Sequence, residues 1–246
     1  MKRGRLGRYS VWQARDFVLE RGVAVLIIGL LLGYMAYLAI KPMRAMLGPD
    51  WTTKAGAPFT QIIDSMLSQV IALAVLIAVN GIVSNDRHLG YFRFLFAKPV
   101  NRVSYYAQLF TVHLAGVLVM MSILMGVFWL GVAPIPVLPI LFYTLVVYMA
   151  MGGIGFFIST ATRHDWVVLT GVWLGSRVIR VLYSDKPDLR AKLVQVLPPV
   201  HRIDDVANHL LVGQMAATSD VVWLVGYGAV FFVLGLYVIH RRSLID

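Results

Sequence analysis

The chain has no cysteine and a single glutamate, Glu20, and charged residues of both signs make up only 14% of its 246 positions. A soluble domain carries about 25% charged residues. Without cysteine the chain can form neither a disulfide framework nor a thiolate metal site. Charge is missing altogether from residues 103–162, a stretch of 60 positions. About 20 apolar residues suffice to cross a bilayer, so this stretch is long enough to cross twice, which excludes a soluble protein.

Apolar segments recur along the whole chain. The stretch of 60 uncharged residues must turn near Pro134, Pro136 and Pro139, because proline removes backbone donors and breaks helices. The predicted spans cover about residues 22–40, 62–84, 104–132, 137–161, 166–183 and 221–240. The sequence therefore predicts an all-α, polytopic membrane protein with about six transmembrane helices, organised as a single domain over residues 1–246.

The segments between the spans also carry helical patterns. Residues 1–21 hold six basic residues and an apolar face with Trp12 and Leu19, which predicts an amphipathic interface helix at the amino terminus. Residues 41–61 contain glycine and proline and are expected to form a loop. Residues 184–220 predict two amphipathic helices at the outer interface, between the fifth and sixth spans. The apolar stripe of the second consists of Ile203, Val206, Ala207, Leu210 and Leu211.

The orientation follows from the distribution of lysine and arginine. With the amino terminus inside, 13 of the 22 basic residues face the cytoplasm and 9 face the other side. Because positive charge near span ends collects on the cytoplasmic side, both termini are predicted to be cytoplasmic. The net charge of +10 is then explained by basic flanks facing anionic membrane lipid, and nucleic acid is not expected as a partner.

The longest predicted cytoplasmic loop, between the second and third spans, reads NDRHLGYFRFLFAKPVNRVSYY over residues 85–106. Four aromatic residues alternate with Arg87, Arg93 and Lys98, and Pro99 ends the helix before it. A solvated linker has no reason to display four aromatic side chains. The loop therefore either packs on lipid headgroups, as in some other membrane protein, or docks as an amphipathic helix into the groove of a partner.

At this loop the sequence resembles the permease subunits of type-2 ATP-binding-cassette (ABC) exporters. Those permeases typically carry an acidic residue, a glycine a few positions later, an apolar stretch, and Pro-Val-x-Arg before the third span. Asp86, Gly90 and the PVNR of residues 99–102 match this order and approximate spacing. The resemblance extends to the basic helix before the first span, the six-span layout, the amphipathic insert before the last span and the closing RRSL of residues 241–244.

The resemblance implies that the loop forms a cytoplasmic coupling helix that seats in a separate ABC ATPase subunit. The implied coupling interface consists of Asp86, Arg87, Gly90, Tyr91, Arg93, Phe94, Lys98, Pro99 and Arg102. It also implies a second permease copy or a related permease as partner, and a place in a prokaryotic inner membrane. ATP and Mg²⁺ would be bound by the ATPase, because a phosphate-binding loop requires Gly-Lys-[Ser/Thr] and none of the six lysines follows a glycine. The chain would then be no enzyme itself and bind no cofactor directly, and its substrate stays open.

Three ionisable residues inside predicted spans are candidates for a substrate path. His113 falls about ten residues into the third span, near the bilayer midplane, where ionisable groups are functional candidates; a neutral histidine bonded to a neighbouring helix is the alternative. Arg177 and Arg180 share a face of the fifth span. They either line the path and attract an anionic substrate, reach to the outer headgroups, or pair with Asp64 or Asp185. No metal site is predicted.

Two other classes of protein remain open. A secondary transporter would need carboxylates for its coupling ion inside the bundle, and beyond Asp64, at the boundary of the second span, the sequence offers none. A membrane scaffold or assembly subunit would need no such groups. Co-purification with an ATPase whose hydrolysis depends on this chain separates the exporter from both.

Overall fold

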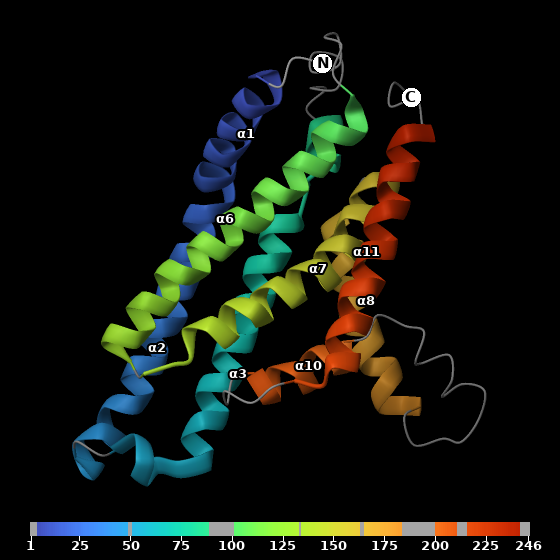
Figure 1. Cartoon of the computed structure of the whole chain (residues 1–246). Coiled ribbons are helices and arrows are strands. Elements are labelled where there is room, and N and C mark those ends of the chain that lie inside the picture. The colour runs from blue at the N-terminus through green and yellow to red at the C-terminus, as the bar shows by residue number, and fades with distance from the viewer. Residues whose placement is uncertain are drawn as a thin grey trace. The chain divides into compact units, whose positions relative to one another are not determined.

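The structure, a computed structural model, describes residues 4–48, 51–88, 101–132, 134–162, 165–183, 200–210 and 216–241. Every regular element in these ranges is a helix, which confirms the predicted all-α class for the described chain. The elements are α1 (Gly4–Phe17), the π-helical turn η1 (Val18–Gly22), α2 (Val23–Leu47), α3 (Trp51–Val79), α4 (Ser84–His88), α6 (Arg102–Gly131), α7 (Val137–Ala161), α8 (Asp165–Tyr183), α10 (Val200–Leu210) and α11 (Thr218–Arg241) (Figure 1).

Five helical stretches among the described residues are long and apolar enough to cross a membrane: Tyr9–Leu47, Ser65–Asp86, Arg102–Gly131, Val137–Ala161 and Thr218–Arg241. They correspond to the predicted first, second, third, fourth and sixth spans. The predicted fifth span coincides with α8, whose apolar part, Val167–Ser176, is shorter. Large apolar side chains such as Leu31, Tyr34 and Leu130 are exposed on these helices, as expected where lipid covers the surface. The chain therefore has the build of a multi-pass membrane protein.

The predicted loop over residues 41–61 is wrong. Helix α2 continues through Pro42 to Leu47 and ends at Gly48, whose φ of 75° is a left-handed conformation that favours glycine. Helix α3 already begins at Trp51 and contains Pro58. A proline removes one backbone donor and bends a helix without always ending it. Figure 1 shows the first turns of α3 at an angle to the rest of that helix.

The chain folds into two compact units, each made of pieces of several helices. The first comprises Met1–Ala78, Thr111–Leu145 and Ala207–Met215, and the second comprises Val79–Phe110, Val146–Val206 and Ala216–Asp246. Helices α3, α6, α7 and α10 contribute to both units, and the single domain expected from the sequence stays a prediction.

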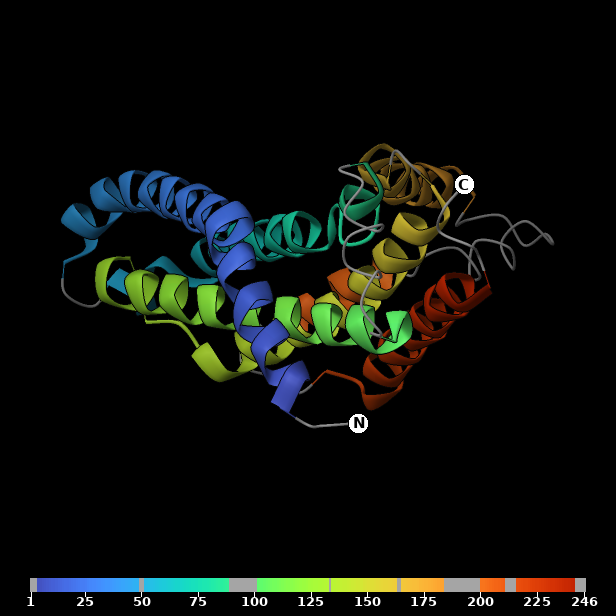
Figure 2. The ribbon, with the colours of Figure 1, turned by 90° about the horizontal axis from the view of Figure 1, so that it is seen from above.

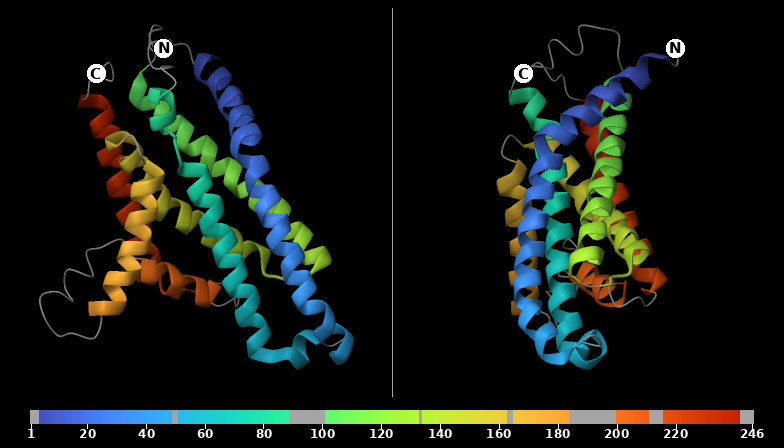
Figure 3. Two further views of the ribbon diagram at one scale, coloured as in Figure 1. Left: turned by 180° about the vertical axis from the view of Figure 1, so that it is seen from behind. Right: turned by 90° about the vertical axis from the view of Figure 1, so that its left-hand side faces the viewer.

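In the first unit, α1, η1 and α2 form one helical stretch that packs along α6. A Cβ added at Gly116 would overlap the ring of Phe17, and one added at Gly33 would lie 2.8 Å from the ring of Phe128. Small residues let helices approach this closely in membranes. Figure 2 shows α1 crossing over α6, and the right view of Figure 3 shows α1 leaving the line of α2 at η1.

Helix α1 occupies the place of the predicted amphipathic interface helix. Its apolar residues Val11 and Trp12 are exposed, while Gln13 and Phe17 are buried. The exposed apolar face is what a lipid surface would cover, and the location of α1 at the interface stays a prediction.

In the second unit, α7 and α11 cross at a pair of glycines. A Cβ added at Gly153 would overlap the backbone of Gly228, so the two helices are in backbone contact there. Next to the crossing, the rings of Phe110, Phe156 and Phe232 pack with centroids 4.5 to 5.8 Å apart. This aromatic cluster joins the start of α6 to α7 and α11.

Helix α10 matches the second predicted amphipathic stripe. Of the stripe residues, Ile203, Val206, Ala207 and Leu210 are buried, and Leu211 lies outside the described residues. Arg202 on its polar side pairs with Asp220 of α11 at 2.5 Å. The first of the two predicted amphipathic helices lies outside the described residues, and a position of either at the outer interface stays a prediction.

Candidate functional site

The loop with the predicted coupling interface joins α4 to α6, and the structure describes both of its ends. Asp86 and Arg87 lie in α4, and Arg102 is the first residue of α6; of Arg87 only the backbone is described. The predicted interface residues that lie outside the described chain are Gly90, Tyr91, Arg93, Phe94, Lys98 and Pro99. What can be built from the residues upward is therefore the base of the loop, which we define as Asp86, Asn101, Tyr106 and Ser159.

The entry to the loop is a tight turn held by a side chain from another helix. Helix α3 ends at Val79, and Gly81 turns the chain with a φ of 73°. The hydroxyl oxygen of Ser159 in α7 accepts hydrogen bonds from the backbone N–H groups of Val83 (3.0 Å) and Ser84 (3.1 Å). The first N–H groups of a helix have no partner within it, so Ser159, which is fully buried, fixes the start of α4 to α7.

At the end of the loop, Asn101 caps the first turn of α6. The side-chain oxygen of Asn101 accepts hydrogen bonds from the N–H groups of Val103 (3.0 Å) and Ser104 (3.4 Å). Its backbone carbonyl accepts the N–H of Tyr105 at 3.0 Å. Asparagine is among the preferred residues at this position, where it satisfies the free N–H groups of the first turn. Asn101 therefore sets the point at which α6 begins.

Entry and exit are tied to each other by one hydrogen bond. The hydroxyl of Tyr106 in α6 donates to the Oδ2 atom of Asp86 in α4 at 2.9 Å. Tyr106 is fully buried and Asp86 half-buried. A hydrogen bond to a carboxylate is stronger than one between neutral groups. The loop between the two ends thus starts and finishes at neighbouring, fixed points.

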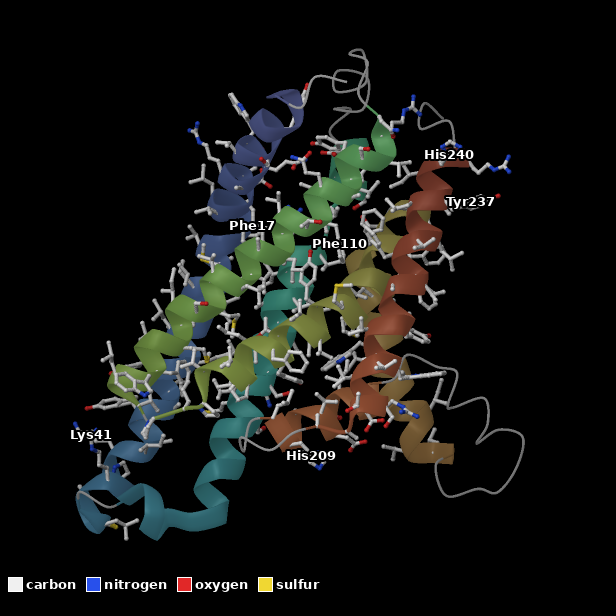
Figure 4. All side chains as sticks on the ribbon, viewed as in Figure 1. Phe17, Lys41, Phe110, His209, Tyr237 and His240 are labelled. Carbon is white, nitrogen blue, oxygen red and sulfur yellow. The ribbon has the colours of Figure 1, made fainter. Side chains whose placement is uncertain are left out.

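Behind the loop base, the first turns of α6 are fastened to α7. The hydroxyl of Tyr148 donates to the backbone carbonyl of Phe110 at 2.9 Å, and their rings pack 5.0 Å apart. Phe110 is labelled in Figure 4, which draws the surrounding side chains. This contact and the aromatic cluster of Phe110, Phe156 and Phe232 hold the start of α6 against α7 and α11.

His113, a predicted candidate for the substrate path, is buried and bonded to two other helices. Its Nδ1 atom lies 2.7 Å from Nη1 of Arg21 and 2.9 Å from the carbonyl oxygen of Ala78 in α3. The ring of Phe17, labelled in Figure 4, packs on it with centroids 5.1 Å apart. These contacts favour the alternative considered from the sequence, an interhelical hydrogen bond.

The other two path candidates, Arg177 and Arg180, lie on α8. Only the backbone is described at both positions, and the side chain of Asp64, one proposed acidic partner, is not described either. Asp185, the second proposed partner, lies outside the described residues. All three interpretations of the arginine pair therefore stay predictions.

The polar side chains described in the candidate site form hydrogen bonds that cap helices or hold one helix to another. No group of three or more His, Cys, Asp or Glu residues among them could hold a metal ion. The loop base uses one carboxylate, two hydroxyls and one amide, each bonded to a neighbouring backbone or side chain.

Sequence reasoning missed two residues of the loop base, Ser159 and Tyr106, and one partner of His113, Arg21. Ser159 and Tyr106 carry no local signal for their contacts, because their partners are 75 and 20 positions away. Arg21 is one of the six basic residues that predict the amino-terminal interface helix, and nothing local to it indicates a partner in α3 or α6. Asn101 was read as part of the PVNR pattern, although an asparagine directly before a long apolar helix is also a cap signal.

No protein-family model, no curated protein and no solved structure matches the chain in the comparisons. Over the described residues, the fold and the site define an all-helical protein with five helices long and apolar enough to span a membrane, in which the loop between α4 and α6 is held at both ends.

Proposed function

We propose that this chain is the transmembrane subunit of a type-2 ABC exporter, which forms the translocation path and couples to separate ATPase subunits. The observation that carries the proposal is the loop base. The aromatic and basic loop leaves α4 and enters α6 at points joined by the bond between Tyr106 and Asp86. A passive connector has no need of such a tie, whereas a segment that transmits force does.

The loop base gives a route for force from the loop to the spans. A push on the loop acts on Asp86, and the bond to Tyr106 passes it to α6. Ser159 holds the start of α4 to α7, so displacement of the loop reaches α3, α6 and α7 together. In the proposed exporter, closure of the ATPases on ATP moves the loop and the amino-terminal helix and switches the cavity between cytoplasmic and outer access.

The proposal includes a six-span topology. Helix α8 has 19 residues and a length of about 28 Å at 1.5 Å per residue, close to the roughly 30 Å of a bilayer core. We assign it as the fifth span, with α1 on the cytoplasmic surface and α10 at the outer interface. Both termini are then cytoplasmic, in a prokaryotic inner membrane.

The partners follow from the same proposal. Two ATPase subunits bind ATP and Mg²⁺, and the chain is present twice or beside a related permease. The chain itself contributes no catalytic residue to ATP hydrolysis. Lipid contacts the exposed apolar faces of the spans.

The test is association with an ATPase. The tagged chain is isolated from its native membranes in mild detergent, and the co-purified proteins are assayed for ATP hydrolysis. Phe94→Ala and Arg102→Glu should each weaken association by roughly tenfold or more, because aromatic and arginine residues tend to be energetic anchors of interfaces. Phe142→Ala, at an exposed site in α7, and Arg241→Glu, at the end of α11, are the matched controls.

Each outcome separates the proposal from its rivals. Unchanged association and hydrolysis in both loop variants would remove its main support. Absence of any ATPase together with uptake driven by an ion gradient would indicate a secondary transporter. Absence of both activities, with other membrane proteins bound instead, would indicate a scaffold or assembly subunit.

A further inference from the structure

The buried stripe of the first helical stretch changes its spacing at η1. The buried positions are Gln13, Phe17, Gly22, Val25, Gly29, Gly33, Ala36 and Ile40. Successive positions are three or four apart, as on one face of an α-helix, except for the step of five from Phe17 to Gly22. A π-helical turn holds one residue more than an α-helical turn, which accounts for this step. Arg21, four residues after Phe17, is thereby displaced to the side of the stripe.

From this side position Arg21 reaches two other helices. Its Nη1 atom donates to the carbonyl oxygen of Ala78 in α3 at 2.9 Å. The same atom lies 2.7 Å from Nδ1 and 3.3 Å from Nε2 of His113 in α6. One guanidinium nitrogen thus joins the amino-terminal stretch to α3 and α6.

The donors and acceptors in this cluster restrict how the imidazole of His113 can be bonded. Arginine only donates and a carbonyl only accepts. Nδ1 of His113 cannot both accept from Arg21 and donate to Ala78. Nδ1 lies 2.7 Å from Nη1 of Arg21 and 2.9 Å from the carbonyl oxygen of Ala78, so we assign Nδ1 as the acceptor from Arg21 and the imidazole proton to Nε2.

The carbonyl that Arg21 binds belongs to the end of a helix. In a continued α-helix the N–H of Ile82 would bond to Ala78, but it bonds instead to the carbonyl of Val79 at 3.3 Å. The last carbonyls of a helix lack internal partners, and in an apolar setting each needs an external donor. A cation at a carboxyl-terminal helix end is also favoured by the helix dipole. Arg21 therefore caps α3 from another helix.

We propose that η1 and Arg21 form a latch between the amino-terminal helix and the end of α3 that leads into α4. With Arg21 bound, α1 and the end of α3 move as one body; with Arg21 released, they move separately. The π-helical turn is what directs Arg21 to Ala78. The latch is a property of this chain alone and does not depend on the proposed exporter function, so each can fail without the other.

The first test measures the distance between α1 and α3. The chain has no native cysteine, so spin labels can be placed at Trp12 and Leu73, which are exposed on α1 and α3. The parent protein should give one narrow distance distribution, and Arg21→Gln should add a second, longer population. Arg15→Gln removes the same charge from an exposed site on α1 and should leave the distribution unchanged. An unchanged distribution in Arg21→Gln, or the same change in both variants, would overturn the latch.

The second test follows hydrogen exchange at the end of α3. Loss of a hydrogen bond to a charged group corresponds to about tenfold to hundredfold faster opening, so the amides around Ala78 should exchange faster by this factor in Arg21→Gln. Deletion of Leu19 removes the extra residue of η1 and retains Arg21, and it should accelerate exchange as well. Protection equal to that of the parent in the deletion variant would show that the π-helical turn does not direct the arginine.

Two variants at His113 keep the proposal testable if the Arg21→Gln protein does not accumulate in the membrane. The amide of asparagine can replace Nδ1 of a histidine, whereas that of glutamine reaches the position of Nε2. His113→Asn should therefore retain protection around Ala78, and His113→Gln should lose it. Loss in His113→Asn alone would overturn the assigned acceptor, and full protection in both variants would overturn the link from Arg21 to α6.

Discussion

Replacement of Gly153 by alanine should separate α7 from α11 and destabilise the protein. A Cβ at this position would overlap the carbonyl oxygen of Gly228 and lie 2.6 Å from its carbonyl carbon and 2.8 Å from its Cα atom. Backbone atoms cannot rotate away as a flexible side chain can. Since carbon atoms pack at about 3.5–4.0 Å, the helices must move apart by roughly 1 Å, and such overpacking costs about 1–3 kcal/mol.

The control is another glycine in the same helix pair. Gly226 in α11 has no atom within 4 Å of an added Cβ, and alanine there is favoured over glycine by helix propensity. Gly153→Ala should lower the midpoint of thermal unfolding in detergent by several degrees, at about 2–4 °C per kcal/mol, while Gly226→Ala should leave it unchanged or raise it. Gly228→Ala should act like Gly153→Ala. The double variant should cost less than the sum, because helices already apart have room for the second methyl group. Equal midpoints for Gly153→Ala and Gly226→Ala would refute the contact.

Three further predictions concern the loop base and the topology. Tyr106→Phe removes the tie to Asp86, and we expect a loss of about 1–2 kcal/mol, measured by thermal unfolding, with an unchanged midpoint counting against the bond. Ser159→Ala removes the hydroxyl that accepts from the buried N–H groups of Val83 and Ser84 and should destabilise by about 1–3 kcal/mol, whereas Ser159→Thr keeps the hydroxyl and should recover part of the loss. Single cysteines at Thr53 and Ser243 test orientation: an impermeant thiol reagent applied from outside should label only the first in intact cells, and both after permeabilisation.

The approximate positions of the five described helices long enough to span a membrane could be predicted, because charge and hydropathy act locally. Helix α7 runs over Val137–Ala161, the predicted range, since prolines precede it and a charged turn follows it. The prediction of a loop over residues 41–61 was wrong because it assumed that a proline ends a helix. Helix α2 retains its other backbone bonds around Pro42, and its end is set instead by Gly48, where the left-handed conformation is available to glycine.

The loop base could be predicted only in part. The residues of the loop itself mark the segment, because aromatic and basic side chains alternate there. The contacts that hold its ends, from Tyr106 to Asp86 and from Ser159 to the start of α4, join residues whose separation in the chain gives no periodic signal. The step of five between Phe17 and Gly22, in contrast, is visible in the sequence once the buried face is known, and it would have indicated a π-helical turn.

The contacts along α6 differ between its two ends. Among the described residues, its hydrogen bonds to other helices lie in its first turns, at Tyr106, Phe110 and His113. Beyond Gly116 its contacts with α2 are apolar, as where Leu124 lies against a glycine.

A hydrogen bond between two helices fixes their relative position. Apolar side chains packed on glycine resist sliding only weakly, because lipid offers these side chains an equally apolar surface. Beyond Gly116, these apolar contacts should therefore permit small sliding between α6 and α2, the shear motion that packed helices allow.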